Sequence, residues 1–192
     1  MAIHTEINTK IEKAFETLLK DTRFDKLTVT AIAKEAGISN QTFYRYYTDK
    51  IDLALQLSFK LLSSFALIYG DNSTWKEVAI SILHSVKNHP VLFKRLIEDP
   101  DGLDMIIKSM FMISDHFTGK PSSAYAGSVW AVALKEWRKE NFKTPVEEVY
   151  NNIRNNQPAV DVVCDEELCN KCLAEFENIR LRHFCSTDKN DD

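Results

Sequence analysis

Glycine and proline are scarce in this 192-residue chain, with five of each, and the alternation of valine and threonine typical of β-strands is almost absent. No apolar run approaches the length needed to cross a lipid bilayer, and the first residues lack the charged-then-apolar pattern of a secretory signal. These absences argue against a β-rich fold and against a membrane protein. They predict an all-α protein of the cytoplasm.

Signatures of catalysis are also missing from the sequence. It contains no glycine-rich phosphate loop, no paired-carboxylate arrangement and no Ser-His or Cys-His nucleophile motif. We therefore expect neither enzymatic activity nor a cofactor. The net charge of −4 does not by itself indicate a nucleic-acid partner, so any surface that contacts DNA has to be local.

Only four cysteines are present, and the reducing cytosol makes a disulfide framework an unsuitable explanation for them. Cys164, Cys169 and Cys172 form a C-x4-C-x2-C pattern, and Cys185 follows later. Because Cys169 and Cys172 share a helix face, they could chelate a soft metal such as zinc, with His183 nearby. The spacing fits no standard zinc module, so inert thiols, a metal site and a redox sensor remain alternatives.

Amphipathic segments fill most of the chain. Their apolar residues recur at helical spacing, and Ser, Thr, Asp or Pro stands at many of their starts. Helices are expected at 5–20, 29–36, 40–46, 50–69, 74–88, 90–98, 101–117, 123–141, 146–155 and 164–184, followed by a disordered tail at 187–192.

Two short helices separated by a glycine turn give residues 28–47 the pattern of a helix-turn-helix. Thr28 is expected to cap the first helix, Gly37 to supply a left-handed turn, and Ser39 to cap the second helix. Phe43 and Tyr47 are four residues apart, so they share a face and should pack inward. In such a motif the second helix lies in the DNA major groove.

The outward face of that second helix carries Gln41, Thr42, Tyr44 and Arg45. Amide, hydroxyl, phenol and guanidinium groups suit base edges and phosphate oxygens. Lys50, at the start of the next helix, adds a positive charge where backbone N–H groups already favour phosphate. The alternative is an ordinary amphipathic helix whose tyrosines are half-buried at a surface.

The stretch LTVTAIAKEAGISNQTFYRYYTDKIDL closely resembles the DNA-binding signature of TetR-family transcriptional repressors, with Tyr47 in place of the usual phenylalanine. The resemblance covers about residues 10–55. It implies that Tyr44 and Lys50 hold phosphates and that Asn40 and Gln41 provide specificity. The full set of DNA-binding residues that it implies is Thr28, Thr30, Asn40, Gln41, Thr42, Tyr44, Tyr46 and Lys50.

The resemblance also implies the domain organisation. A helix-turn-helix domain at residues 1–50 would share a long helix with a helical ligand-binding and dimerisation domain at 51–186, and 187–192 would be the tail. The partners implied are a second copy of the chain and a pseudo-palindromic operator in double-stranded DNA. Two recognition helices about 34–36 Å apart would match successive major grooves.

The segment at 122–141 is the main candidate for the dimer interface, together with either 146–155 or 164–184. Small residues in it would let helices approach closely, and two tryptophans would serve as large anchors. Burial within one subunit is the alternative. The small residues are Ala124, Ala126, Gly127, Ala131 and Ala133, and the anchors are Trp130 and Trp137.

A ligand-controlled regulator needs a pocket whose occupant binds two conformations with different affinity. Apolar side chains and histidines of the middle helices are the candidates, with plain core as the alternative, and a sizeable apolar or aromatic compound is expected. They are Phe65, Tyr69, His84, Phe93, Met105, Met110, Phe111 and His116.

The leading interpretation is therefore a homodimeric repressor that a small-molecule ligand releases from its operator. Two alternatives stay open. One is a DNA-binding regulator controlled by a protein partner without a small ligand, and the other is control by metal or thiol redox through Cys164, Cys169 and Cys172.

Overall fold

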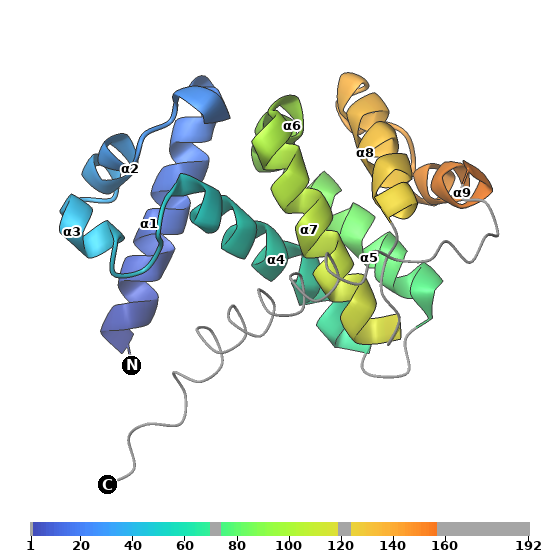
Figure 1. The fold of residues 1–192 in the computed structure, drawn as a ribbon, viewed down its shortest axis with the longest axis horizontal. Helices are drawn as coiled ribbons and strands as arrows, with labels where there is room; N and C mark the ends of the chain where they lie inside the picture. Colours follow the sequence, from blue (N-terminus) through green and yellow to red (C-terminus); the bar gives the residue numbers. More distant parts are fainter. Residues whose placement is uncertain (1, 70–73, 119–123, 157–192) are drawn as a thin grey trace, which may run out of the picture.

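The computed structural model describes residues 2–69, 74–118 and 124–156 (Figure 1). Over these residues the chain forms nine α-helices and one short 3-10 helix, without a β-strand, which confirms the expected all-α fold. The predicted helix at 164–184, its cysteines and the tail lie outside the described residues.

Three helices and a 3-10 turn form the N-terminal unit, at the left of Figure 1. Its core contains Ile11, Phe15, Ile32 and Phe43, each fully buried. The elements are α1 (Ala2–Asp21), η1 (Phe24–Lys26), α2 (Val29–Glu35) and α3 (Asn40–Phe43).

A long helix, α4 (Lys50–Tyr69), runs from the N-terminal unit into the centre of the molecule (Figure 1). The predicted cap is confirmed at its start, because the Asp49 carboxylate accepts from the backbone N–H groups of Ile51 and Asp52 at 2.7 and 2.8 Å. Around it lie α5 (Trp75–Asn88), α6 (Pro90–Glu98) and α7 (Pro100–Thr118).

Two further helices, α8 (Ala124–Lys139) and α9 (Val146–Asn156), lie at the opposite end from α3 (Figure 1). Asn141 and Phe142 take left-handed backbone conformations, with φ of 52° and 58°, which ends α8 two residues earlier than expected. The Trp137 indole closes this turn by donating to the Thr144 carbonyl at 3.0 Å.

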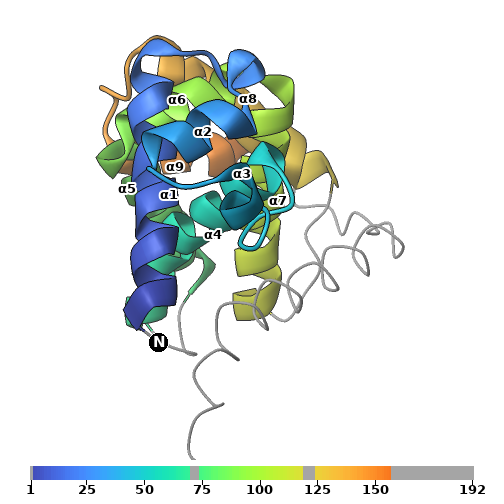
Figure 2. The same ribbon diagram turned by 90° about the vertical axis from the view of Figure 1, so that its left-hand side faces the viewer.

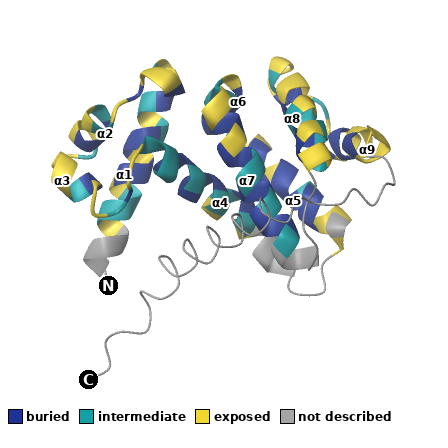
Figure 3. Cartoon of the chain, in the orientation of Figure 1, coloured by how far each residue is buried: buried dark blue, intermediate teal, exposed yellow. Residues whose placement is uncertain are grey.

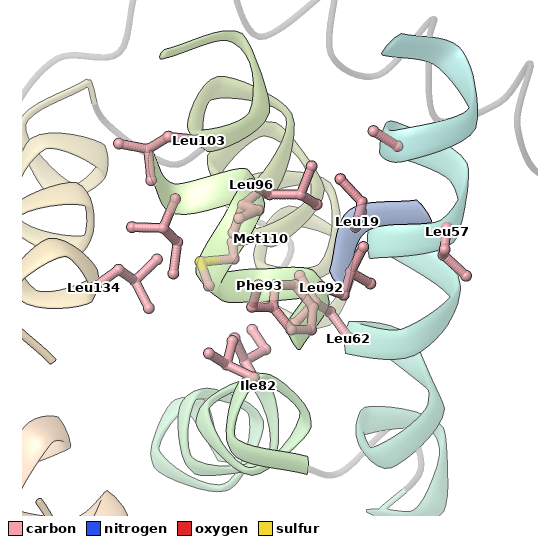
Figure 4. Close-up of a cluster of buried hydrophobic side chains, with 14 of the residues drawn as sticks. Leu19, Leu57, Leu62, Ile82, Leu92, Phe93, Leu96, Leu103, Met110 and Leu134 are labelled. Atoms are coloured by element: carbon pink, nitrogen blue, oxygen red, sulfur yellow. The ribbon is translucent and has the colours of Figure 1, made fainter. Parts of the chain in front are cut away.

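The core runs continuously from the N-terminal unit to α9. Figure 3 shows buried residues along the facing sides of the helices and exposed residues on their outer sides. Figure 4 shows Leu19 of α1 close to Leu92 and Leu96 of α6, all within this core. Among the described helices, none combines the length and the apolar character needed to cross a membrane.

Candidate nucleic-acid interface

The helix-turn-helix is built by two local caps and one glycine. Thr28 accepts from the Ala31 backbone N–H at 3.2 Å at the start of α2, and Ser39 accepts from the Thr42 N–H at 3.0 Å at the start of α3. Gly37 between them has φ of 68°, the left-handed conformation that glycine adopts without strain. All three predictions for these residues are confirmed.

The segment that follows Ser39, here called the recognition segment (residues 39–46), is shorter as a helix than expected. Regular α-helix ends at Phe43, and Tyr44 is its C-cap. The next N–H groups bond three residues back, from Arg45 to the Thr42 carbonyl and from Tyr46 to the Phe43 carbonyl. The chain therefore tightens into turns rather than continuing the helix to 46.

The inward face of the segment is confirmed as packing surface. Phe43 and Tyr47 are 0% and 2% exposed, and their ring centroids lie 5.7 Å apart. Burial is the main cause that raises the pKa of the Tyr47 hydroxyl above its ordinary value. The carboxylates of Glu12 and Asp52 raise the pKa further, and a hydrogen bond with Asn8 opposes the shift.

The outward face is polar and open to solvent. Gln41 and Arg45 are exposed, and Tyr44, at 57%, is the most exposed aromatic side chain in the described part of the chain. Figure 2 views this end of the molecule and shows α2 and α3 neighbouring each other there, and Figure 3 shows exposed residues along both. One side of the segment thus carries exposed hydrogen-bonding groups, and the other side is anchored by buried aromatic rings. This arrangement suits a helix that enters a groove of DNA.

Two hydroxyl contacts orient polar groups at the start of α3. The Asn40 amide donates to the Thr30 hydroxyl of α2 at 3.0 Å, so these two predicted DNA-binding residues lie side by side. Thr42 is half-buried and its hydroxyl bonds to that of Ser39 at 2.9 Å. Tyr46 is half-buried and packs against the core. The side chains of Thr42 and Tyr46 are therefore less exposed to solvent than those of Gln41 and Tyr44.

Lys50 makes structural contacts that sequence reasoning did not foresee. Its ammonium group donates to the backbone carbonyls of Phe24 and Asp25 at 2.8 and 3.0 Å and lies 5.0 Å from the centre of the Phe24 ring. These contacts tie α4 to η1. Since an ammonium group has three N–H donors, one remains for a phosphate oxygen.

The predicted ligand-binding residues are distributed over different environments. Phe93 and Met110 are packed in the core and lie close together in Figure 4, and Met105 is also buried. His84 is exposed, whereas Phe111 is half-buried beside Gly127. The side chains of Phe65, Tyr69 and His116 lie outside the described residues.

A groove of about 590 Å³ lies between α8 and α9, away from all of the predicted ligand-binding residues. Its floor is apolar, and two carboxylates and two amides stand among its lining residues. Val132 is 62% exposed there and Tyr125 is 46% exposed. The lining comprises Tyr125, Ser128, Val129, Val132, Ala133, Glu136, Trp137, Glu140, Thr144, Val149, Asn152, Ile153 and Asn156.

Ser58 of α4 is a further residue that the sequence did not single out. Its side chain is fully buried, and its hydroxyl has no hydrogen-bond partner among the residues that the structure describes. An unsatisfied hydroxyl in a core is costly and has no sequence signature. Within the described ranges no group of three or more His, Cys, Asp or Glu side chains is placed to hold a metal ion, and the cysteines lie outside those ranges.

Comparisons with known proteins bear on both the N-terminal unit and the whole fold. Residues 13–57 match the family described as bacterial regulatory proteins, tetR family. Over 89 residues the chain is 27% identical to the HTH-type dhaKLM operon transcriptional activator DhaS of Lactococcus lactis subsp. lactis (strain IL1403). That match covers 45% of this chain and 46% of the relative, so it spans about half the length of that protein.

Among solved structures, the fold is similar to that of a TetR transcriptional regulator from Rhodococcus sp. RHA1. The TM-score is 0.52 at 13% identity, over 79% of this chain and 93% of that one. A structure of the dihydroxyacetone kinase operon activator DhaS gives a TM-score of 0.49 at 18% identity, over 90% and 97% of the two chains. The likeness to the Rhodococcus protein supports a shared all-helical fold.

Proposed function

We propose that this chain, a DNA-binding transcriptional regulator of the TetR family, acts as a homodimeric repressor that a small-molecule ligand releases from a pseudo-palindromic operator. The observation that carries the DNA-binding part is the two-sided recognition segment. Phe43 and Tyr47 are buried on one side, while Gln41, Tyr44 and Arg45 are exposed on the other.

The contacts to DNA follow from the chemistry of that surface. Amide groups make paired hydrogen bonds to base edges, so Asn40 and Gln41 are assigned to sequence specificity. The Tyr44 hydroxyl and the remaining Lys50 N–H are assigned to phosphate oxygens, which fix the position of the helix on the duplex. Thr28, Thr30, Thr42 and Tyr46 complete the surface.

The dimer is assigned to the groove between α8 and α9. A half-exposed row of apolar side chains, including Tyr125 and Val132, is the kind of surface that a second copy would cover. This end of the molecule lies opposite the recognition segment (Figure 1), so pairing through α8 and α9 leaves both recognition segments free for DNA. A two-fold dimer would then present them to two half-sites.

Control by a small molecule is supported by the buried hydroxyl of Ser58 on α4. A ligand that entered the core between the middle helices and bonded this group would satisfy it, and so would favour the conformation that binds the ligand. Because the buried core of the middle helices is mainly apolar, we expect an apolar compound with one polar group.

The proposed direction of regulation is repression. The Lactococcus relative is named as an activator, and the same DNA-binding surface serves either direction. A reporter gene behind the bound DNA decides between them. If the chain represses, deleting it raises expression, and if it activates, deletion lowers expression.

Binding of the purified protein to operator DNA, selected from a random duplex library, tests the proposal. We expect Tyr44→Ala and Gln41→Ala to weaken binding by about threefold to thirtyfold each. The matched control is Asn151→Ala, an exposed amide on α9 outside the groove. If both variants select and bind DNA like wild type, the recognition segment does not make the sequence-specific contacts with DNA.

The salt dependence of binding adds a second criterion. Contacts to phosphates release counterions, so affinity should fall steeply between low and physiological salt concentrations. A wild-type affinity that is independent of salt would contradict the assignment of phosphate contacts to this surface.

A further inference from the structure

The α6 helix is joined to the N-terminal unit by an arginine. Arg95 donates from Nε to the backbone carbonyl of Leu19 and from Nη2 to that of Lys20, both at 2.9 Å. These carbonyls belong to the last turn of α1. The helix that supports the recognition segment is therefore held from outside by a side chain located 75 residues further along the sequence.

The carbonyl groups at the end of α1 suit a guanidinium. The last carbonyls of a helix have no partner within the helix, and they carry its partial negative charge. The Leu18 carbonyl accepts from the Thr22 N–H at 2.9 Å, and Arg95 donates to the next two carbonyls. A planar fork with several N–H donors can hold both at once, which a single ammonium group does less well. The Arg95 side chain is 28% exposed, so these bonds are partly shielded from water.

The same arginine is linked to α8. Arg95 pairs with Glu98 at 3.3 Å, one helical turn further along α6, and Glu98 pairs with Arg138 of α8 at 2.7 Å. Lys94 adds a parallel contact to the Asn141 side chain at 3.0 Å, just beyond the end of α8. A polar path thus runs from the last turn of α8 across α6 to the last turn of α1.

Apolar packing underneath makes this path a rigid link. Leu19 is fully buried and lies close to Leu92 and Leu96 of α6 in Figure 4. The carbonyl that Arg95 holds belongs to the same residue, so backbone and side chain of Leu19 are both fixed on α6. A shift of α6 would therefore carry the end of α1 with it.

We propose that Arg95 is a positioning residue for DNA binding. By holding the end of α1 on α6, it sets the angle of the N-terminal unit relative to α6. Through Glu98 and Arg138 it makes that angle depend on α8. This inference rests on the proposed function, in which α8 forms the dimer and α3 reads DNA. In the dimer, the angle determines the separation of the two recognition segments. The link therefore selects the spacing between half-sites.

The first experiment measures the angle without DNA. Donor and acceptor dyes are attached to keto amino acids introduced at Glu35 and Glu147, both exposed, so the native cysteines stay unchanged. One labelled chain is mixed with excess unlabelled protein, and single-molecule energy transfer is recorded. Arg95→Met should broaden or shift the distribution of energy-transfer efficiencies. The distribution of Arg95→Lys should lie between those of Arg95→Met and wild type. Thr74→Ala removes the cap of α5, far from α1, and should leave the distribution unchanged.

The second experiment measures the consequence for DNA. Affinity is compared for the selected operator and for operators with one or two base pairs inserted between the half-sites. Wild type should discriminate strongly against the insertions. In Arg95→Met the ratio of the affinity for the selected operator to the affinity for an operator with inserted base pairs should fall by about threefold to tenfold. Thr74→Ala should lower the stability of the protein and leave this ratio unchanged.

The outcomes separate the link from the proposed function. An unchanged energy-transfer distribution in Arg95→Met overturns the link whatever the DNA result. A changed distribution with an unchanged spacing ratio overturns the role in DNA positioning. If wild type binds no DNA, the proposed function fails, while the energy-transfer result still decides whether Arg95 sets the angle of the N-terminal unit.

Discussion

The hydroxyl of Tyr47 donates a hydrogen bond of 2.5 Å to the side-chain carbonyl of Asn8, joining the residue after the recognition segment to α1. The Asn8 amide donates to Glu12 at 3.4 Å, and Lys60 of α4 donates to the other Glu12 oxygen at 2.7 Å. Glu12 is 8% exposed. A polar network therefore connects α1, α4 and the turn after α3, which all support the same surface.

Tyr47→Phe tests the contribution of this network to stability. The substitution keeps the buried ring and removes only the hydroxyl, which leaves the Asn8 carbonyl without this donor. We expect the free energy of unfolding to fall by about 1–2 kcal/mol. Guanidinium denaturation measures it, with Tyr44→Phe as the control because that hydroxyl is on an exposed side chain. Equal stability of Tyr47→Phe and wild type would contradict a stabilising bond.

The pKa of Tyr47 predicts a dependence on pH. Burial raises its pKa in the folded protein above the ordinary value of 10.0. The folded state then holds the proton more tightly than the unfolded state, so this stabilisation is full below that value and is lost as the pH rises above it. Unfolding of wild type and Tyr47→Phe compared at about pH 9 and about pH 11 should show the difference shrinking at the higher pH. A difference that grows or stays constant would contradict the raised pKa.

Gly37→Ala isolates the cost of the left-handed turn. A Cβ atom at this position would meet nothing within 4 Å, so no clash contributes. Its φ of 68° still strains an alanine, and we expect a loss of about 1–2 kcal/mol in the free energy of unfolding. Gly37→Asn should lose less, because asparagine tolerates this conformation. Chemical denaturation of the three proteins distinguishes these results, and an alanine variant as stable as wild type would argue against the turn.

The features that were predictable from the sequence are local ones. Thr28, Ser39 and Asp49 cap helices that begin immediately after them, so the partner of each side chain lies two or three residues away. Phe43 and Tyr47 are four residues apart, and the Tyr47 N–H bonds to the Phe43 carbonyl at 3.1 Å, so they share a face although the regular helix ends at Phe43. Such relations depend on spacing, and spacing is visible in a sequence.

The contacts that the sequence did not predict join a side chain to backbone carbonyls far away in the sequence. Lys50 bonds to the carbonyls of Phe24 and Asp25, and Arg95 bonds to those of Leu19 and Lys20. Every residue has a carbonyl, so no residue type marks such an acceptor. The same limit applies to the ligand site, since a stripe of Met and Phe predicts burial and does not distinguish a filled core from a cavity.

Lys50→Met separates the two roles of this lysine. The variant loses both bonds to η1, and we expect a fall of about 1 kcal/mol in stability. If its third N–H holds a phosphate, the slope of log affinity against log salt concentration should also become shallower by about 0.9. Lys143→Met, at an exposed position beyond α8, is the control. A loss of stability with an unchanged salt slope would assign Lys50 to the fold alone.

Val132→Glu tests the dimer through α8 and α9. Val132 is the most exposed of the large hydrophobic side chains in the described part of the chain, at 62%, and it lines the groove. A carboxylate there costs nothing in a monomer but would be desolvated in a dimer, at a cost of several kcal/mol. We expect light scattering to give a monomer mass, with unchanged helical circular dichroism.

The matched control is Val91→Glu, the same substitution at a valine that is 42% exposed on α6 and lies outside this groove. It should remain dimeric. Because a single recognition segment contacts only one half-site, the monomeric Val132→Glu variant should also lose most of its operator affinity while it keeps weak binding to DNA of any sequence. If Val132→Glu stays dimeric, the interface lies on another surface. The candidate helix at 164–184 would then be the next segment to test.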